Sequence, residues 1–177
     1  KRSYRTLGSL DPEGPLKMLV TLTSRGAAVQ RIELAGSQFH DQDDRTGYLG
    51  HLAVESTATG CRVGVVGAGT PAAAAGVRAG DVITTFDGLA ILDARSLAET
   101  LAKAKPRQTV TLGLLREGSP LTLEATLTRR PLEVVRPEFE TEPVADARGQ
   151  ACDPFSFRLS LESRDGMKRP EIFTEVP

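Results

Sequence analysis

The segment Tyr48-Leu49-Gly50-His51 is predicted to form a turn with a glycine at its third position. Glycine in such a turn allows neighbouring main-chain N–H groups to point into one concavity, where they can hold a carboxylate without any catalytic side chain. The segment Leu49 to Val54 is expected to form an edge strand behind this turn. An extended peptide could pair with that edge. This region therefore predicts recognition of a peptide C-terminus or an internal strand of a protein.

Other reactive residues do not make a recognisable site. His40-Asp41-Gln42-Asp43-Asp44 lacks the glycine and distal glutamate of a calcium loop and is predicted to be a solvated linker. His40, His51 and Cys61 do not have zinc-ligand spacing, and no serine lies in G-x-S-x-G. Cys61 and Cys152 could pair, but two free or buried thiols are favoured. We predict no catalytic residue, no metal and no cofactor.

A glycine-rich segment permits an enzymatic alternative. Residues 63–72 contain G-x-G-x-x-A after an apolar run, and Asp87 follows about 20 residues later, as in a dinucleotide fingerprint. A parallel βαβ unit, however, needs a connection of roughly a dozen residues or more. Pro71, Gly76 and Gly80 interrupt the segment where that helix would lie, so a nucleotide-binding enzyme remains only a remote alternative.

Composition sets outer limits. The chain has 177 residues, of which 40% are hydrophobic and 25% charged, enough for a core in one or two domains. Its 22 basic and 23 acidic residues give a net charge of -1, which favours neither nucleic acid nor an anionic membrane. No apolar run approaches the roughly 18 residues that span a bilayer. The first residue is Lys1 rather than Met, which we interpret as a fragment of a longer protein.

The elements that must position the turn are mostly strands. Thr70 and Asp93 are expected to cap two helices, a short one of about five residues starting at Pro71 and a longer one over Ala94 to Ala104. Period-two patterns and turn residues predict the strands, which are Leu16 to Thr23, Ala27 to Leu34, Cys61 to Val66, Val82 to Phe86, Thr109 to Leu115, Leu121 to Leu127 and Phe155 to Leu161. The polar stretches Gln38 to Thr46 and Arg136 to Asp153 are predicted linkers.

The order of signals from Gly47-Tyr48-Leu49-Gly50-His51 through Gly69 to Ile83 and the turn Asp87-Gly88 resembles a PDZ domain of the bacterial HtrA kind. The resemblance implies a peptide groove between the edge strand and the longer helix. The implied binding residues are Tyr48, Leu49, Gly50, His51, Ala53, Ala94, Ala98 and Leu101. His51 makes the terminal pocket more polar than usual, and we expect its imidazole to strengthen carboxylate capture in mild acid. Closure of the groove by the linker Arg136 to Asp153 is the alternative.

A second resemblance concerns the first flank. Tyr4 to Pro12 and Met18 to Leu34 are similar, over about thirty residues, to the start of the periplasmic domain of YidC-type membrane protein insertases, in which a strand, an Arg-Gly turn and a second strand begin a β-sandwich. It implies a non-enzymatic region on the periplasmic side of the inner membrane, belonging to a membrane-embedded parent. A PDZ-containing part of an HtrA-like periplasmic protease is the alternative function.

These observations predict a mainly β (α+β) fold in which a PDZ-like, partly open barrel with two helices is inserted into a split β-sandwich. The expected domain limits are 1–44 and 131–177 for the two parts of the sandwich and 45–130 for the inserted module. Each flank alone has too few strands to be stable, so we expect the two flanks to pack together.

Overall fold

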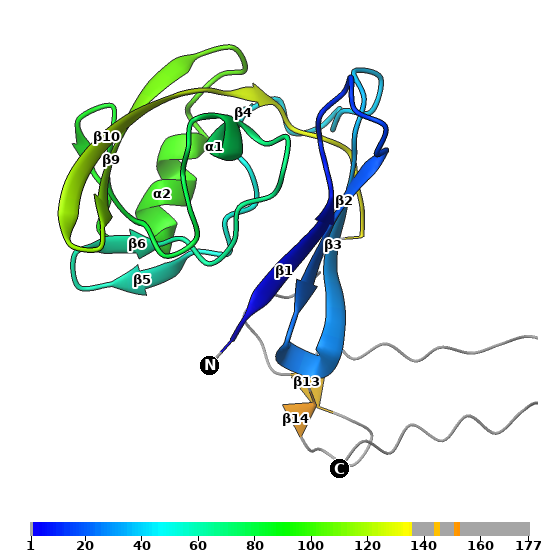
Figure 1. The fold of residues 1–177 in the computed structure, drawn as a ribbon, viewed down its shortest axis with the longest axis horizontal. Coiled ribbons are helices and arrows are strands. Elements are labelled where there is room, and N and C mark those ends of the chain that lie inside the picture. Colours follow the sequence, from blue (N-terminus) through cyan, green and yellow to red (C-terminus); the bar gives the residue numbers. More distant parts are fainter. Residues whose placement is uncertain (1, 136–143, 146–150, 153–177) are drawn as a thin grey trace, which may run out of the picture.

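A computed structural model describes residues 2–135, 144–145 and 151–152 of the chain. The fold is mainly β, as predicted, and its described part has two α-helices. Figure 1 shows one sheet standing beside a compact module that contains both helices. Every strand pair in the described residues is antiparallel, and the module's largest sheet does not close into a barrel.

The sheet beside the module, called here the flanking sheet, has the strand order β1-β2-β3-β12. Its strands are β1 (Tyr4–Gly8), β2 (Met18–Thr23), β3 (Ala28–Leu34) and β12 (Glu133–Val135). The short 3-10 helix η1 (Arg25–Ala27) joins β2 to β3, which confirms the predicted strand-turn-strand. The strand β12 comes after the module in sequence and pairs with β3, so the chain leaves and re-enters the same sheet.

The module is built on a sheet with the order β10-β9-β7-β6-β5, to which β8 adds beside β7, and on the separate pair β11-β4. The strands are β4 (Gly47–Tyr48), β5 (Glu55–Thr57), β6 (Gly60–Arg62), β7 (Val82–Phe86), β8 (Leu89–Ala90), β9 (Thr109–Arg116), β10 (Ser119–Thr126) and β11 (Thr128–Arg129). Its core cluster runs from Leu49 to Leu127 in sequence and includes Phe86, Ile83 and Leu112. No member of this cluster comes from the flanking sheet.

Both helices start where capping chemistry predicts. The helix α1 (Pro71–Ala74) follows Thr70, whose hydroxyl accepts from the Ala73 N–H at 3.2 Å. The helix α2 (Ala94–Leu101) follows Asp93, whose carboxylate accepts from the Ser96 N–H at 2.7 Å. The Ser96 hydroxyl in turn accepts from the Asp93 N–H, which completes a capping box. The helix α2 ends three residues before the predicted end at Ala104.

The predicted edge strand over Leu49 to Val54 is wrong. Ala53 has a φ of +43°, a left-handed conformation that interrupts an extended segment. The Leu52 carbonyl instead accepts from the N–H groups of Gly64 and Val65, at 2.9 and 3.1 Å. Regular pairing starts only at β5, whose partner β6 is in turn shorter than the predicted strand from Cys61 to Val66.

The glycine-rich segment serves a contact between the module and the flanking sheet. An added Cβ on Gly67 would overlap the Leu19 side chain of β2, and one on Gly69 would overlap the main chain at Asp11. The Leu10 N–H donates to the Ala68 carbonyl at 2.9 Å across the same contact. Because the following helix has only four residues and the neighbouring strands are antiparallel, these glycines do not belong to a dinucleotide-binding βαβ unit.

Part of the sequence-based interpretation falls outside the described residues. This applies to the predicted strand Phe155 to Leu161 and to most of the predicted linker Arg136 to Asp153. Within that linker, β13 (Val144–Ala145) pairs with β14 (Ala151–Cys152). Cys61 is buried and its thiol is free. Neither described helix is long and apolar enough to cross a membrane.

Candidate peptide-binding groove

A cavity of about 670 Å³ lies beside α2 and the turn after β4. The turn and the irregular segment behind it form one wall, and the apolar side chains of α2 form the second. All eight residues proposed from the sequence line this cavity, namely Tyr48, Leu49, Gly50, His51, Ala53, Ala94, Ala98 and Leu101. We call it the groove. The structure therefore brings the predicted residues together, although the wall from Leu49 to Val54 is not a strand.

The turn that lines the groove contains main-chain donors without a partner among the described residues. Within the described part of the chain, the N–H groups of Leu49 and Gly50 have no hydrogen-bond partner. Gly50 has a φ of +128°, a conformation that a side chain would strain. The Leu49 carbonyl accepts from the Ala72 N–H of α1 at 2.9 Å, which holds the turn against the module. Two adjacent N–H groups in such a concave turn can bind an anion such as a carboxylate.

Tyr48 lines the groove and also connects the turn to the flanking sheet. Its hydroxyl contacts the Glu33 carboxylate of β3 and also accepts from the His51 N–H at 3.0 Å. The Arg130 guanidinium lies 5.4 Å from the centre of the Tyr48 ring, within cation–π range. With only 4% of its surface exposed, Tyr48 fixes the turn to β3.

The flanking sheet supplies a third wall that the sequence did not predict. Residues of its strands and of the η1 segment line the groove opposite α2, namely Tyr4, Thr23, Arg25, Gln30 and Arg31. Gln30 is 7% exposed, and its Oε1 atom has no hydrogen-bond partner among the described residues. The His51 Nε2 atom is likewise buried, and it has no partner in that part of the chain. No local signal marks Gln30 as a site residue, because its position depends on how the sheet docks on the module.

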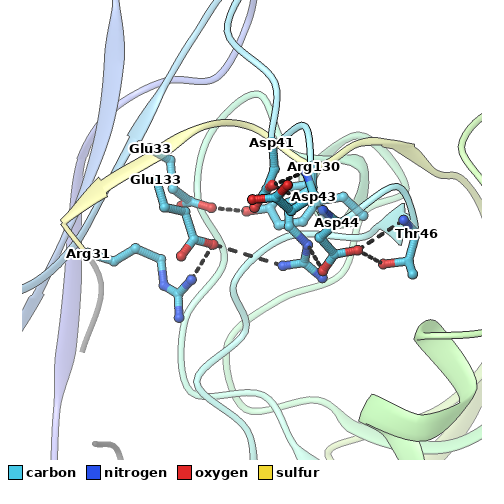
Figure 2. A network of polar contacts seen from close by, with 9 residues as sticks. Arg31, Glu33, Asp41, Asp43, Asp44, Thr46, Arg130 and Glu133 are labelled. Carbon is cyan, nitrogen blue, oxygen red and sulfur yellow. Dashed lines mark hydrogen bonds and ion pairs between the residues drawn. The ribbon is translucent and has the colours of Figure 1, made fainter. Parts of the chain in front are cut away.

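A network of charged residues holds this third wall in place. Figure 2 shows Arg31 of β3 and Arg130 both directed towards Glu133 of β12. Arg130 also pairs with Asp44 at 2.8 Å. The Thr46 hydroxyl donates to the Asp44 carboxylate at 2.6 Å, and the Thr46 N–H donates to it at 3.0 Å. The acidic stretch predicted to be a solvated linker thus takes part in fixing the module to the sheet.

Hydrogen bonds and charge determine the protonation of Asp44. Partial burial acts to raise its pKa, but the hydrogen bonds from Thr46 and the nearby Arg130 charge outweigh burial, so the pKa lies below its ordinary value. Asp44 is therefore ionised at neutral pH. Its negative charge faces the Arg130 guanidinium, which stabilises the ion pair that anchors the linker.

Burial shifts the pKa values of the two groups nearest the turn in opposite directions. It raises the pKa of Glu33, although the Tyr48 hydrogen bond and the Arg31 charge act to lower it. Burial, assisted by the Arg31 charge, lowers the pKa of His51 to about 3. The expectation that His51 strengthens carboxylate capture in mild acid is therefore wrong, because this imidazole stays neutral there.

The groove is bounded at its far end by a contact between its two main walls. The Ala94 N–H at the start of α2 donates to the Ser56 hydroxyl of β5 at 3.1 Å. This bond holds β5 and α2 together beyond Val54. Among the described residues, no group of three or more His, Cys, Asp or Glu side chains is placed to hold a metal ion.

Comparison with known proteins identifies the region around the groove. A family model described as the PDZ domain matches residues 34–127. The periplasmic pH-dependent serine endoprotease DegQ of Escherichia coli (strain K12) is 35% identical over 85 residues, which are 45% of this chain and 19% of that protein. A probable periplasmic serine endoprotease DegP-like of Bartonella henselae is 43% identical over 61 residues, covering 34% of this chain and 12% of that protein.

The solved structures that match include an HtrA-type protease AlgW with decapeptide. It is 30% identical with a TM-score of 0.45, and the match covers 49% of this chain and 30% of that chain. The chain thus spans about a fifth of the length of the first curated relative. The curated relatives are periplasmic serine endoproteases, which contradicts the predicted function as a region of a membrane protein insertase. They give no support to the insertase resemblance of the first flank or to a membrane-embedded parent. A strand-turn-strand pattern is common among β-proteins, so it could not identify that family.

Proposed function

The chain belongs to the PDZ domain family, and from this premise we propose that its groove binds the C-terminal end of a peptide or protein. The proposal rests above all on the unpaired N–H groups of Leu49 and Gly50, two residues that line a cavity bounded by α2. A ligand carboxylate is an acceptor that both groups can share. The exposed Ala98 and half-buried Leu101 of α2 offer an apolar wall for the residues that precede it.

The binding mode differs from simple strand addition. Because Ala53 interrupts the extended backbone, main-chain pairing with a ligand is limited to short stretches on either side of it. We therefore propose that carboxylate capture at the turn contributes most of the orientation of the ligand. Tyr48 is proposed to position the turn through the contact of its hydroxyl with Glu33. The other groove residues are proposed to contact the ligand, namely Leu49, Gly50, His51, Ala53, Ala94, Ala98 and Leu101.

We further propose that the module works in the periplasm as part of an HtrA-type serine protease. The support is the sequence similarity to periplasmic serine endoproteases over the module. In this setting the chain would deliver or sense peptides, and peptide-bond cleavage would belong to another part of the protein. We also propose that residues 131–177 complete the flanking sheet begun by residues 1–44, because β12 pairs with β3.

A groove-filling substitution tests peptide binding. In Ala98→Arg, a long cationic side chain on the exposed face of α2 would occupy the groove. We expect at least a tenfold loss of affinity for fluorescein-labelled heptapeptides with a free C-terminus, measured by fluorescence polarisation on the full chain. Ala74→Arg at the exposed end of α1 is the matched control, since it adds the same side chain outside the groove and should bind normally.

Peptides that end in a carboxamide distinguish recognition of the carboxylate from non-specific binding. They lack the charge that the Leu49 and Gly50 N–H groups would bind, so we expect their affinity to fall as well. Equal binding of carboxylate and carboxamide peptides would contradict the assigned role of the turn. Unchanged binding by Ala98→Arg would contradict the location of the site.

A further inference from the structure

Two residues that line the groove have buried polar atoms that an apolar ligand side chain would leave unpaired. Gln30 Oε1 and His51 Nε2 are both buried and have no hydrogen-bond partner in the described part of the chain. Both residues line the same cavity, from different elements. A buried polar atom without a partner is energetically unfavourable, so the groove favours a ligand that supplies the missing hydrogen bonds.

The side chain of a ligand's C-terminal residue would be placed close to these two atoms. His51 directly follows Gly50, one of the two residues whose N–H groups are unpaired. The side chain of a C-terminal residue starts from the same Cα atom as the captured carboxylate, so it must lie beside the turn. Gln30, on β3, lines the same groove as part of the third wall.

Resting on the proposed peptide binding, we propose that the groove selects a C-terminal residue with a hydroxyl side chain, and that Gln30 and His51 determine this selectivity. A hydroxyl can donate to the Gln30 oxygen and accept from a neutral imidazole N–H at the same time. A methyl group of the same shape can do neither. The low pKa of His51 agrees with this arrangement, because the imidazole keeps only one N–H and carries no charge to attract a second carboxylate.

The selectivity depends on the docking of the flanking sheet. Gln30 reaches the groove because Leu19 of β2 packs against Gly67 and because the Tyr48 hydroxyl contacts Glu33. A module without this sheet would keep the turn and α2 but would lose one of the two polar groups. With the third wall, the site binds the ligand carboxylate at the turn and also discriminates between side chains of the ligand's C-terminal residue.

The test compares two isosteric ligands on the full chain. Two pools of fluorescein-labelled heptapeptides, randomised at the first six positions, end in Thr or in Val, which have nearly the same shape. We expect the Thr pool to bind about tenfold more tightly, as for one or two net hydrogen bonds. In Gln30→Leu and in His51→Leu the preference should fall to about twofold or reverse, because the site then offers an apolar surface.

Gln38→Leu provides the matched control, since it makes the same substitution on an exposed residue outside the groove and should keep the preference. Equal affinity of the wild type for both pools, or tighter binding of Val, would overturn this inference and leave peptide binding intact. Failure of both pools to bind would overturn the proposed function, and this inference with it. The wild-type comparison decides the matter even if one of the variants does not fold.

Discussion

Burial beside the groove controls the protonation of His51 and Glu33. Neither side chain is close to its ordinary titration behaviour, and the two deviate in opposite senses because burial disfavours a cationic imidazole and an anionic carboxylate alike. At the pH of most experiments His51 is therefore neutral. The pKa of Glu33 lies closer to neutral pH than that of an exposed glutamate. Because Glu33 contacts Tyr48, its protonation is coupled to the turn.

His51 should make the protein less stable in acid. Its pKa is about 3 in the folded protein and about 6.5 in the unfolded chain, so between these values the unfolded state binds the additional proton. Stability therefore falls as the pH drops below 6.5. At pH 5 the loss amounts to about 2 kcal/mol. We expect the difference in unfolding free energy between wild type and His51→Leu to change by about this amount between pH 7 and pH 5, in urea titrations followed by circular dichroism.

Glu33→Gln serves as a control of opposite sign. Because the folded-state pKa of Glu33 is raised, the folded protein binds the additional proton, and Glu33 favours folding increasingly as the pH falls through that pKa towards 4.5. Glu33→Gln should therefore increase the loss of unfolding free energy in acid. His51→Leu should decrease that loss. A pH-independent difference for His51→Leu would mean that the imidazole is not buried in solution.

At the scale of elements, the loop between β6 and α1 controls how closely the flanking sheet approaches. Gly67 and Gly69 leave room for the Leu19 side chain and for the main chain near Asp11. The same loop accepts a hydrogen bond from the Leu10 N–H. Side chains in this loop would hold the sheet away from the module, which would also withdraw Gln30 from the groove.

Gly69→Ala should therefore disturb the docking of the sheet. Gly69 and Gly76 have similar φ values, +74° and +86°, so an alanine at either site incurs comparable backbone strain of roughly 1–2 kcal/mol. Only at Gly69 would the new Cβ meet other atoms, since nothing lies within 4 Å of it at Gly76. We expect Gly69→Ala to cost at least about 2 kcal/mol more than Gly76→Ala, as for other overpacked sites.

Hydrogen exchange locates the effect. The amide of Leu10 should lose protection in Gly69→Ala but keep it in Gly76→Ala, because its acceptor is the Ala68 carbonyl next to the substituted residue. Equal stability of the two variants, with Leu10 protected in both, would contradict this prediction. It would show that the loop changes its conformation while the sheet stays docked on the module.

At the scale of the whole molecule, the module and the flanking sheet differ in how they are stabilised. The core cluster of the module lies entirely between Leu49 and Leu127. The contact between module and sheet instead combines the packing of Leu19 with a hydrogen bond to Ala68 and with the polar network around Arg130. Interfaces of this mixed kind resemble those between domains that fold separately.

Residues 45–131 expressed alone should thus unfold cooperatively, but at a lower temperature than the full chain. The fragment retains the core and the β4–β11 pair, yet it exposes Tyr48, which is 4% accessible in the full chain. Losing that burial and the surrounding contacts should cost about 1–3 kcal/mol. Thermal unfolding followed by circular dichroism measures this, with the full chain as reference. A fragment that lacks a cooperative transition would show that the sheet is needed for folding.

Much of the fold could be predicted because its signals are local. Helix starts at Thr70 and Asp93 follow from side chains that bond main-chain groups three residues later. The strand β9 follows from the alternation of its apolar residues. The prediction from Leu49 to Val54 failed because the conformation of Ala53 and the acceptor role of Leu52 depend on the segment near Gly64, which is distant in sequence.

Local signals in the sequence predicted the turn and the two capped helices, because each depends on neighbours within a few positions. The module and its groove residues were predicted from the resemblance to PDZ domains. Only the tertiary structure decided that Tyr48 faces Glu33, that the glycine-rich loop receives the flanking sheet, and that Gln30 forms part of the groove. These features arise where two sheets meet. No periodicity or motif within either sheet encodes which of their residues come into contact, since that depends on shape complementarity and on the burial of polar groups across the interface.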